Sequence, residues 1–370
     1  MISLALALAQ VQIEPIQVPP LRNIYQASAI QSGLLTDNDF DGGGKSYTGA
    51  GAPLVIENRD ANLSNFTYDG EIWLGSGSFN VTNVECKGFR LSGVTGANLT
   101  RIRTDGAEYG VALIGGNNVT VKDSHFKNHR IGMVILPGDP HTHKLEAEAR
   151  GIAWKEGNQW IPGTNLGGMI RSTDGVYFTG NGTTSARIAF TWPEGPFWKT
   201  DPRLPMKDNY YTVAGKRVQW VSDDANGVNI QSNDGVFELG KTYWLHTYNP
   251  KYEVKGIRII GNTFENCHVA GVSAFFIAGS LIQDNIVWGS PDDYEIGLEH
   301  ARDCRIENNI GFLAPGGDVR VRIGLLLGVE NVTIKGNNMP IHYNAKNEPE
   351  VNLVTDSPVK YVGSRSPWVK

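Results

Sequence analysis

The stretch SPDDYEIGLEH, residues 290–300, brings several ionisable side chains together. They are Asp292, Asp293, Glu295, Glu299 and His300. Side chains two residues apart share one face of a strand, so Glu295 and Glu299 would lie on the same face if this strand is exposed. We take the four carboxylates as candidate catalytic residues, because paired carboxylates can serve as acid and base in glycosidic cleavage or can ligate a hard cation such as Ca²⁺. The alternative is a solvated acidic loop.

The second candidate group is the sequence GDPHTHK. In it, Asp139, Pro140 and His141 match the Asp-Pro-His motif of alginate C5-epimerases, whose His and Asp work at C5 of the sugar. This resemblance covers three residues and implies catalytic roles for Asp139 and His141, although the Tyr-Gly-Phe that precedes the motif in that family is missing. One alternative is a turn that opens a long excursion of the chain. Another is a metal site that includes His143 and Glu146.

The third candidate group is basic. Arg320 and Arg322 alternate along DVRVRIG, so they would share one face of a strand. A row of guanidinium groups suits an acidic polysaccharide, because each can bind a carboxylate through two parallel hydrogen bonds. Neighbouring acidic residues leave an ordinary salt-bridged surface as the alternative.

Tryptophan is concentrated in one part of the chain. Six of the nine tryptophans lie between residues 139 and 252. Because sugar rings stack on aromatic faces, exposed members of this group would form a glycan platform. Those that we assign to ligand binding are Trp192, Trp198, Trp220 and Trp244. The alternative is the aromatic core of a small β-domain.

A repeated pattern predicts the elements that position these residues. The stretch GIRIIGNTFENC recurs, and alignment on its Asn262 gives the equivalents Ser124, Asn285, Asn309 and Asn337. A unit of short β-runs separated by Gly and Asn cannot bury its apolar face alone, but it can when coils stack. The repeat therefore predicts an all-β fold, a right-handed parallel β-helix, with an Asn ladder at a tight turn. Asn suits that turn because it tolerates the left-handed conformation and its amide can bond to the Asn above and below.

The repeat is interrupted once, and this interruption sets the expected domain boundaries. Far too many residues separate Ser124 from Asn262 for one turn, and the strand-like segments between them suggest an inserted β-rich domain. Insertions of this kind often emerge on the binding face. The predicted parts are a docking or capping segment at 1–60, β-helix at 61–138, the aromatic-rich insertion at 139–252, β-helix at 253–340, and a C-terminal cap or tail at 341–370.

Composition narrows the classes of partner. The net charge is −5 and no run of Lys or Arg occurs, so neither nucleic acid nor a membrane is an expected partner. Three cysteines without metal spacing predict buried, reduced thiols.

The repeats from Asn62 to Pro340 resemble, in architecture, phage tailspike and tail-fibre proteins and pectate-lyase-like carbohydrate-active β-helices. This resemblance implies a virion tail protein that recognises host surface polysaccharide, with degradation of that polysaccharide left open. It also implies a homo-oligomer, most simply a trimer, whose N-terminal segment contacts other tail proteins. The alternatives are a secreted polysaccharide lyase, epimerase or hydrolase, and a non-enzymatic connector or adhesin. No cofactor is expected, with Ca²⁺ kept as an alternative ligand of the acidic coil.

Overall fold

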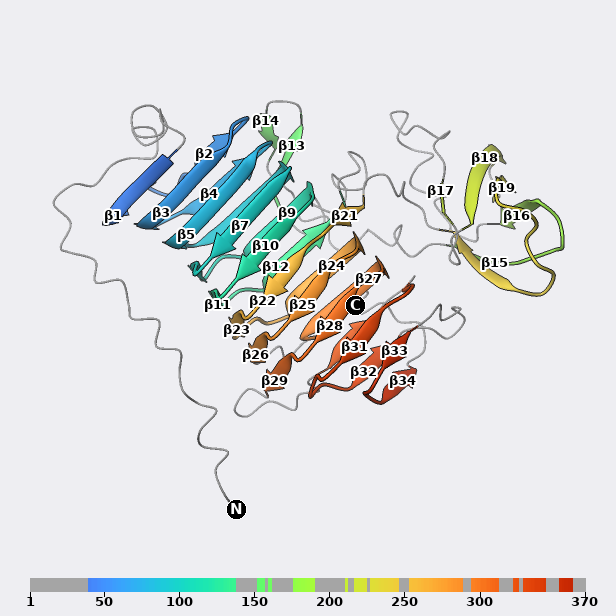
Figure 1. Cartoon of the computed structure of the whole chain (residues 1–370). Coiled ribbons are helices and arrows are strands. Elements are labelled where there is room, and N and C mark those ends of the chain that lie inside the picture. The colour runs from blue at the N-terminus through green and yellow to red at the C-terminus, as the bar shows by residue number, and fades with distance from the viewer. Residues whose placement is uncertain are drawn as a thin grey trace, which may run out of the picture.

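A computed structural model shows the chain as a parallel β-solenoid of about 10 turns (Figure 1). The structure describes residues 39–137, 152–156, 159–161, 176–189, 210–211, 216–224, 227–245, 253–288, 294–312, 322–325, 329–343 and 353–361. Every regular element in these residues is a β-strand, and none is a helix that could cross a membrane. The predicted all-β solenoid with parallel pairing between coils is therefore confirmed.

Two parallel sheets run along the solenoid axis, and we call them sheet A and sheet B. The strands of sheet A are β1 (Asp39–Tyr47), β3 (Ala61–Tyr68), β5 (Ser78–Cys86), β7 (Gly96–Thr100), β8 (Arg103–Asp105), β10 (Val119–Lys122), β11 (His125–Lys127), β22 (Arg258–Ile260), β23 (Thr263–Glu265), β25 (Leu281–Gln283), β26 (Ile286–Trp288), β28 (Arg305–Glu307), β29 (Ile310–Phe312), β31 (Thr333–Lys335) and β33 (Val354–Thr355). Those of sheet B are β2 (Leu54–Glu57), β4 (Glu71–Gly75), β6 (Gly88–Val94), β9 (Tyr109–Gly116), β12 (Ile131–Leu136), β21 (Val254–Lys255), β24 (Ala270–Ala278), β27 (Ile296–Arg302), β30 (Ile323–Leu325), β32 (Ile341–Tyr343) and β34 (Val359–Tyr361).

Sheet A divides into two arms at β5, which pairs with both β7 and β8. We call β7, β10, β22, β25, β28, β31 and β33 the long arm, and β8, β11, β23, β26 and β29 the short arm. One coil therefore runs through sheet B, then the long arm, then the short arm, as β9, β10 and β11 do. Like residues stack on like between coils. Such an inward row is Val121, Ile259, Ile282, Ile306 and Ile334.

The predicted Asn ladder is present between the two arms. Ser124 donates its backbone N–H to Oδ1 of Asn262 at 3.0 Å, although the two residues are 138 positions apart. The Nδ2 atoms of Asn262, Asn285 and Asn309 each donate to Oδ1 of the next Asn, at 3.0, 2.8 and 2.9 Å, and the last acceptor is Asn337. These bonds satisfy buried polar groups where the chain turns a corner.

The conformational reason given for the ladder was wrong in one respect. The left-handed residue is the one before each ladder position. Those residues are Asp123, Gly261, Asp284, Asn308 and Gly336, with φ between 51° and 69°. Asp, Asn and Gly all tolerate this conformation, so the turn uses any of them. The ladder Asn is then selected by its amide alone.

The stack extends past both predicted boundaries of the β-helix. At the start, β1 pairs with β3 and β2 with β4, so the ladders begin at Asp39 rather than at residue 61. At the end, β33 and β34 pair with β31 and β32, so the ladders continue to Tyr361, beyond residue 340. A parallel ladder needs only extended chains that are in register. Sequences without the Asn signature can also provide these, so backbone pairing continues at both ends of the stack.

The insertion differs from the solenoid in its pairing. Its described strands are β13 (Trp154–Glu156), β14 (Gln159–Ile161), β15 (Val176–Thr179), β16 (Ser185–Ala189), β17 (Tyr210–Tyr211), β18 (Arg217–Asp224), β19 (Gly227–Ser232) and β20 (Thr242–Leu245). All of them pair antiparallel, in the orders β13-β14, β15-β20 and β16-β19-β18-β17. The segment GVFELG is irregular, and the buried ring of its Phe237 packs edge-on against Tyr243 with 5.3 Å between ring centroids.

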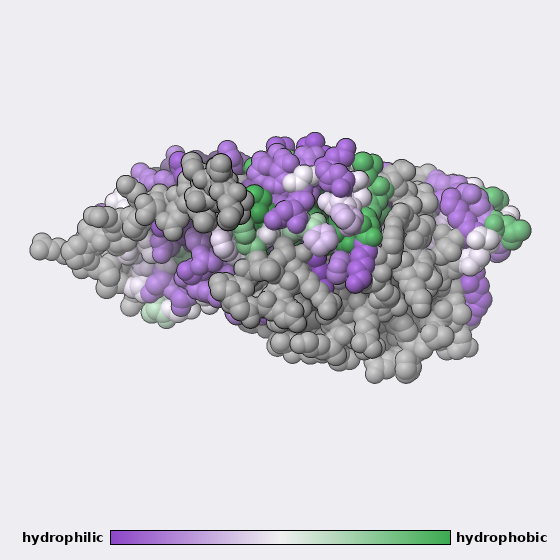
Figure 2. Space-filling model, turned by 90° about the horizontal axis from the view of Figure 1, so that it is seen from below, coloured by the Kyte–Doolittle hydropathy of each residue, from purple (hydrophilic) through white to green (hydrophobic). Residues whose placement is uncertain are grey.

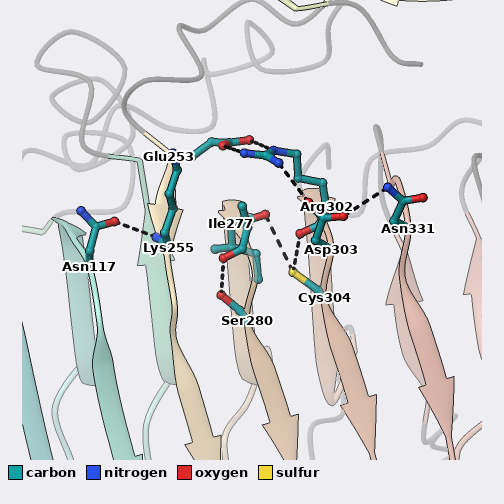
Figure 3. Close-up of polar contacts among 10 residues, drawn as sticks. Asn117, Glu253, Lys255, Ile277, Ser280, Arg302, Asp303, Cys304 and Asn331 are labelled. Carbon is teal, nitrogen blue, oxygen red and sulfur yellow. Dashed lines mark hydrogen bonds and ion pairs between the residues drawn. The ribbon is translucent and has the colours of Figure 1, made fainter. Parts of the chain in front are cut away.

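The end of the insertion that returns to the solenoid is fastened to the stack (Figure 3). Asn117, before it, accepts the backbone N–H of Lys255, after it, at 2.9 Å. Buried Glu253 accepts two hydrogen bonds from Arg302 at the end of β27, at 2.7 and 2.6 Å, and Arg302 also bonds Asp303 at 3.0 Å. The bidentate ion pair between Arg302 and Glu253 thus holds the chain where it returns to the solenoid.

The outer faces of the long arm and of sheet B differ in how deeply their residues are buried. In the long arm, inward residues are buried and outward ones exposed or half-buried, as in β7 and β28. In sheet B, strands β12 and β24 are buried on both faces. The outward residues there form a second apolar cluster, which includes Ile114, Leu136 and Phe275 together with Ile152 of the insertion. The cysteines Cys86, Cys267 and Cys304 are buried and free, as predicted.

Candidate functional site

The outer face of sheet B around β27 holds the predicted acidic residues that the structure describes. Ile296 and Leu298 belong to the solenoid core, so the alternating Gly297 and Glu299 face outward. Glu295 and Glu299 lie on the same face, as predicted. Both are buried, with 0% and 3% of their surface exposed. The loop residues Asp292 and Asp293 lie outside the described residues.

A pair of glycines makes room for an aromatic ring on this face. Gly297 of β27 and Gly324 of β30 are partners in the ladder. A Cβ on Gly324 would overlap the ring of Tyr294, so the ring lies directly against this glycine. The guanidinium carbon of half-buried Arg322 lies 4.6 Å from the centre of the same ring, a cation–π contact. Tyr294 is therefore sandwiched between backbone and Arg322.

Glu295 is tied to the next coil by its side chain. One carboxylate oxygen accepts the backbone N–H of Arg322, and the backbone N–H of Glu295 donates to the Arg322 carbonyl at 3.1 Å. The other oxygen, Oε1, is buried without a hydrogen-bond partner. Loss of hydration raises the pKa of Glu295 to about 7, against the opposing effect of the Arg322 charge and backbone hydrogen bonds. This carboxyl therefore changes its charge near neutral pH.

Glu299 and His300 form a second buried pair on the same strand. His300 Nε2 lies 3.7 Å from Oε1 of Glu299, and both side chains are almost fully buried. The His300 ring stacks on Phe276 of β24 with 4.2 Å between centroids and 6° between planes. Both Phe276 and His300 have left-handed backbones, at φ 53° and 51°. That conformation costs bulky residues on the order of 1–3 kcal/mol each and is concentrated at functional sites.

A second polar group lies on the outer face of sheet B, nearer the N-terminus. Glu71 of β4 accepts from Arg90 Nη2 at 2.7 Å and from the Trp73 indole at 2.9 Å. The Arg90 guanidinium also lies 5.2 Å from the centre of the Tyr109 ring. Arg90 and Gly324 belong to one outward row, which passes in register through β9, β12, β24 and β27.

Several predicted residues cannot be placed in this site. Those outside the described residues are Asp139, His141, Trp192, Trp198 and Arg320. Trp220 lies in β18 and Trp244 in β20, both within the insertion. Their assignments stay predictions. In the part of the chain that the structure describes, no three His, Cys, Asp or Glu side chains gather as a metal site would require.

Sequence reasoning missed Tyr294, Phe276 and the Arg90 group. Glycines at alternate positions in β27 and β30 were the available signal for Tyr294, because an outward glycine in a strand marks a close approach. Phe276 and Arg90 carried no such signal. Their roles depend on contacts between consecutive coils, which the pattern along a single strand does not show.

Comparison with known proteins adds little to this description. No protein-family model matches the chain, and no curated protein matches it. One solved structure with a similar course is that of the Streptococcus pneumoniae surface protein and adhesin PfbA. The alignment has 10% identity and a TM-score of 0.28, and it covers 91% of this chain and 93% of that one.

Proposed function

We propose that this chain is a surface-polysaccharide recognition protein that binds an acidic glycan at the Arg322 end of the outer face of sheet B. The observation that carries the proposal is Arg322 held over the ring of Tyr294 on that face. A guanidinium held against an aromatic ring keeps its position, and the N–H donors of a guanidinium come in pairs. Paired donors are the geometry that the carboxylate of an acidic sugar accepts.

The burial of the middle coils limits the length of this site along the stack. Neighbouring coils lie about 4.8 Å apart, which is close to the length of one sugar unit in an extended polysaccharide. Five ladder steps separate β6, which carries Arg90, from β30, next to Arg322. That distance is about 24 Å. The row between the two groups passes through Ala112, Val134 and Ser273, which are buried, so the glycan would contact only the Arg322 end of this face.

Binding measurements with matched arginine variants test this proposal. The full chain is titrated with alginate, polygalacturonate and hyaluronate. Arg322→Gln should weaken binding of the acidic glycan by about tenfold or more, because a charge-assisted contact is lost. Arg305→Gln is the control, since Arg305 is an exposed arginine of the long arm. Equal binding by both variants, or no acidic glycan bound by the intact chain, would overturn the proposal.

In its fuller form, the protein is a homotrimeric tail component of a phage particle that recognises host polysaccharide, and its N-terminal segment contacts other tail proteins. A secreted location is the alternative. Analytical ultracentrifugation tests the trimer. A stable monomer would count against the tail component but would leave the glycan site of sheet B untouched.

Cleavage of the bound glycan is the second candidate function, and Glu295 favours it. A carboxyl with a pKa of about 7 is suited to general acid or base catalysis near neutral pH, and cleavage by Glu295 requires that glycan binding expose this side chain, which is fully buried. Arg322 could neutralise the sugar carboxylate beside it. Glu295→Gln keeps the side-chain oxygen that accepts the Arg322 N–H but removes the titration. Loss of unsaturated or reducing-end products in this variant, with glycan binding retained, would support catalysis. His141→Ala tests the motif-based alternative in the same assay.

A further inference from the structure

We infer that the outer face of the short arm carries a second glycan site, specific for the ring of a neutral sugar and separate from the acidic-glycan site of sheet B. Two outward rows run along this arm in register. The first is Arg103, His125, Thr263, Ile286 and Ile310. The second is Asp105, Lys127, Glu265, Trp288 and Phe312. Both rows are polar at their N-terminal end and apolar or aromatic in the last two coils.

The apolar end of these rows is exposed. Ile310 and Phe312 of β29 keep 40% and 36% of their surface accessible, and Ile286 and Trp288 of β26 are half-buried. We call these four residues the short-arm patch. Figure 2 views the molecule from below, the side toward which the short-arm strands lie in Figure 1, and shows hydrophobic surface among hydrophilic side chains. An exposed apolar patch on an otherwise polar sheet indicates a binding surface.

The rings of the patch form a short stack that ends at Phe312. Trp288 and Phe312 stack with 4.4 Å between centroids and 27° between planes. Inside the solenoid, Phe126 and Phe264 stack in the same manner at 4.9 Å. Phe312 belongs to the last described short-arm strand, and among the described residues no further aromatic ring of that row follows it. A sugar ring would pack its C–H face on the exposed outer side of Trp288 and Phe312.

The polar end of the rows supplies groups suited to sugar hydroxyls. His125 Nε2 lies 3.0 Å from Oε2 of Glu265, and Lys127 Nζ lies 2.9 Å from Oε1. All three side chains are partly exposed, at 32%, 39% and 42% for His125, Glu265 and Lys127. Glu265 is the direct ladder neighbour of Trp288. The group combines donors and acceptors with charges that nearly cancel, which favours uncharged hydroxyls over a carboxylate.

The edge of β29 argues against a protein strand as the occupant. The Asn338 side chain accepts the backbone N–H of Gly311 at 2.8 Å and donates to its carbonyl at 3.1 Å. These two bonds occupy the backbone groups through which another strand would add to the sheet. A ligand of this face therefore has to use the side chains.

Binding of neutral oligosaccharides tests the inference. The full chain is mixed with hexasaccharides of glucose, galactose and mannose, and binding is followed by saturation-transfer NMR and calorimetry. At least one neutral hexasaccharide should bind. Trp288→Ala and Phe312→Ala should each weaken it on the order of tenfold, and Glu265→Gln should weaken it less. Val354→Ala is the control, because Val354 is an exposed apolar residue of the long-arm strand β33.

The outcomes separate this site from the acidic-glycan site. Arg322→Gln should leave neutral-sugar binding unchanged, and the short-arm variants should leave acidic-glycan binding unchanged. Thermal unfolding of each variant verifies that it is folded, and Phe312→Ala is the milder test because that ring is at the end of the stack. The inference is overturned if no neutral hexasaccharide binds the intact chain or if both aromatic variants bind like the control. A change of oligomeric state in Phe312→Ala would instead make the patch a contact between copies.

Discussion

The long arm of sheet A and sheet B belong to the same coils and line the same hydrophobic core, yet their outer faces differ. Outward residues of the long arm, such as Arg258 and Lys335, are exposed. Outward residues of sheet B include buried Arg90, Glu299 and His300. Buried charges and left-handed bulky residues destabilise a fold unless other interactions compensate. The solenoid needs only its inner rows, so the unusual outer face of sheet B points to function.

The largest expected effect concerns the ion pair that closes the insertion (Figure 3). The Glu253 side chain is 3% exposed and accepts both hydrogen bonds from Arg302. Arg302→Met would leave this carboxylate buried without its guanidinium, so the free energy of unfolding should fall by about 3–5 kcal/mol. Denaturant titration measures the loss.

The matched control lies on the long arm. Arg305, whose side chain is 56% exposed, lies 3.6 Å from Glu307. Arg305→Met should change the free energy of unfolding by no more than about 1 kcal/mol, because water solvates both partners. Similar losses in the two variants would show that the two faces do not differ energetically.

The pH dependence of stability should also differ between the faces. Burial raises the pKa of Glu295 from its ordinary value of 4.5 to about 7, and Arg322 is the charged group that opposes this rise. The folded state therefore binds more protons than the unfolded state between these values, and the free energy of unfolding should fall as pH rises from 4.5 to 7. The full change is about 3 kcal/mol. Glu295→Gln should remove it.

Glu265 of the short arm should give the opposite pH dependence, in which the free energy of unfolding falls as pH falls. Burial alone would raise its pKa, but the hydrogen bond and charge of Lys127, together with His125, hold the pKa below its ordinary value. Its contribution to stability is present above the unfolded pKa and is lost as pH falls through the folded one. Glu265→Gln should therefore reduce the loss of stability in acid. Unfolding curves of Glu295→Gln and Glu265→Gln measured from pH 3 to 8 test these opposite effects. If the free energy of unfolding depended on pH in the same way in both variants, the two predictions would be contradicted.

The sequence predicts the solenoid well because its signal is local and repeated. Asn285 and Asn309 stand at equivalent places in successive copies, and their hydrogen bonds follow from that spacing. The repeat does not reveal the first coil, because DFDGGGKSY, the sequence of β1, lacks the Asn signature. The sequence does not show that the left-handed residue precedes the ladder residue. Asp, Asn and Gly all occur at that place, so no single residue type marks it along the chain.

The candidate site is less predictable because it depends on contacts between coils. Strand geometry alone predicts that Glu295 and Glu299 share one face. Their burial depends on what covers sheet B, which strand geometry does not show. The contact of Tyr294 with Gly324 joins residues 30 positions apart and requires the register of two strands. Alternation along one strand cannot reveal such a contact. The row of Trp288 and Phe312 likewise forms only when β26 and β29 pair.

The smallest of the expected effects tests this contact between coils. Gly324→Ala should reduce the free energy of unfolding by about 1–3 kcal/mol, because the new methyl group overlaps the Tyr294 ring. Gly96→Ala in β7 is the control, since its nearest atoms would be 3.8 and 3.9 Å away, an ordinary contact. The double variant Gly324→Ala, Tyr294→Ala should lose less than the sum of its single variants, because removal of the ring removes the overlap. Additive losses would show that the glycine serves the strand backbone rather than the ring. Arg322 would then lack the fixed support on which the acidic-glycan site depends.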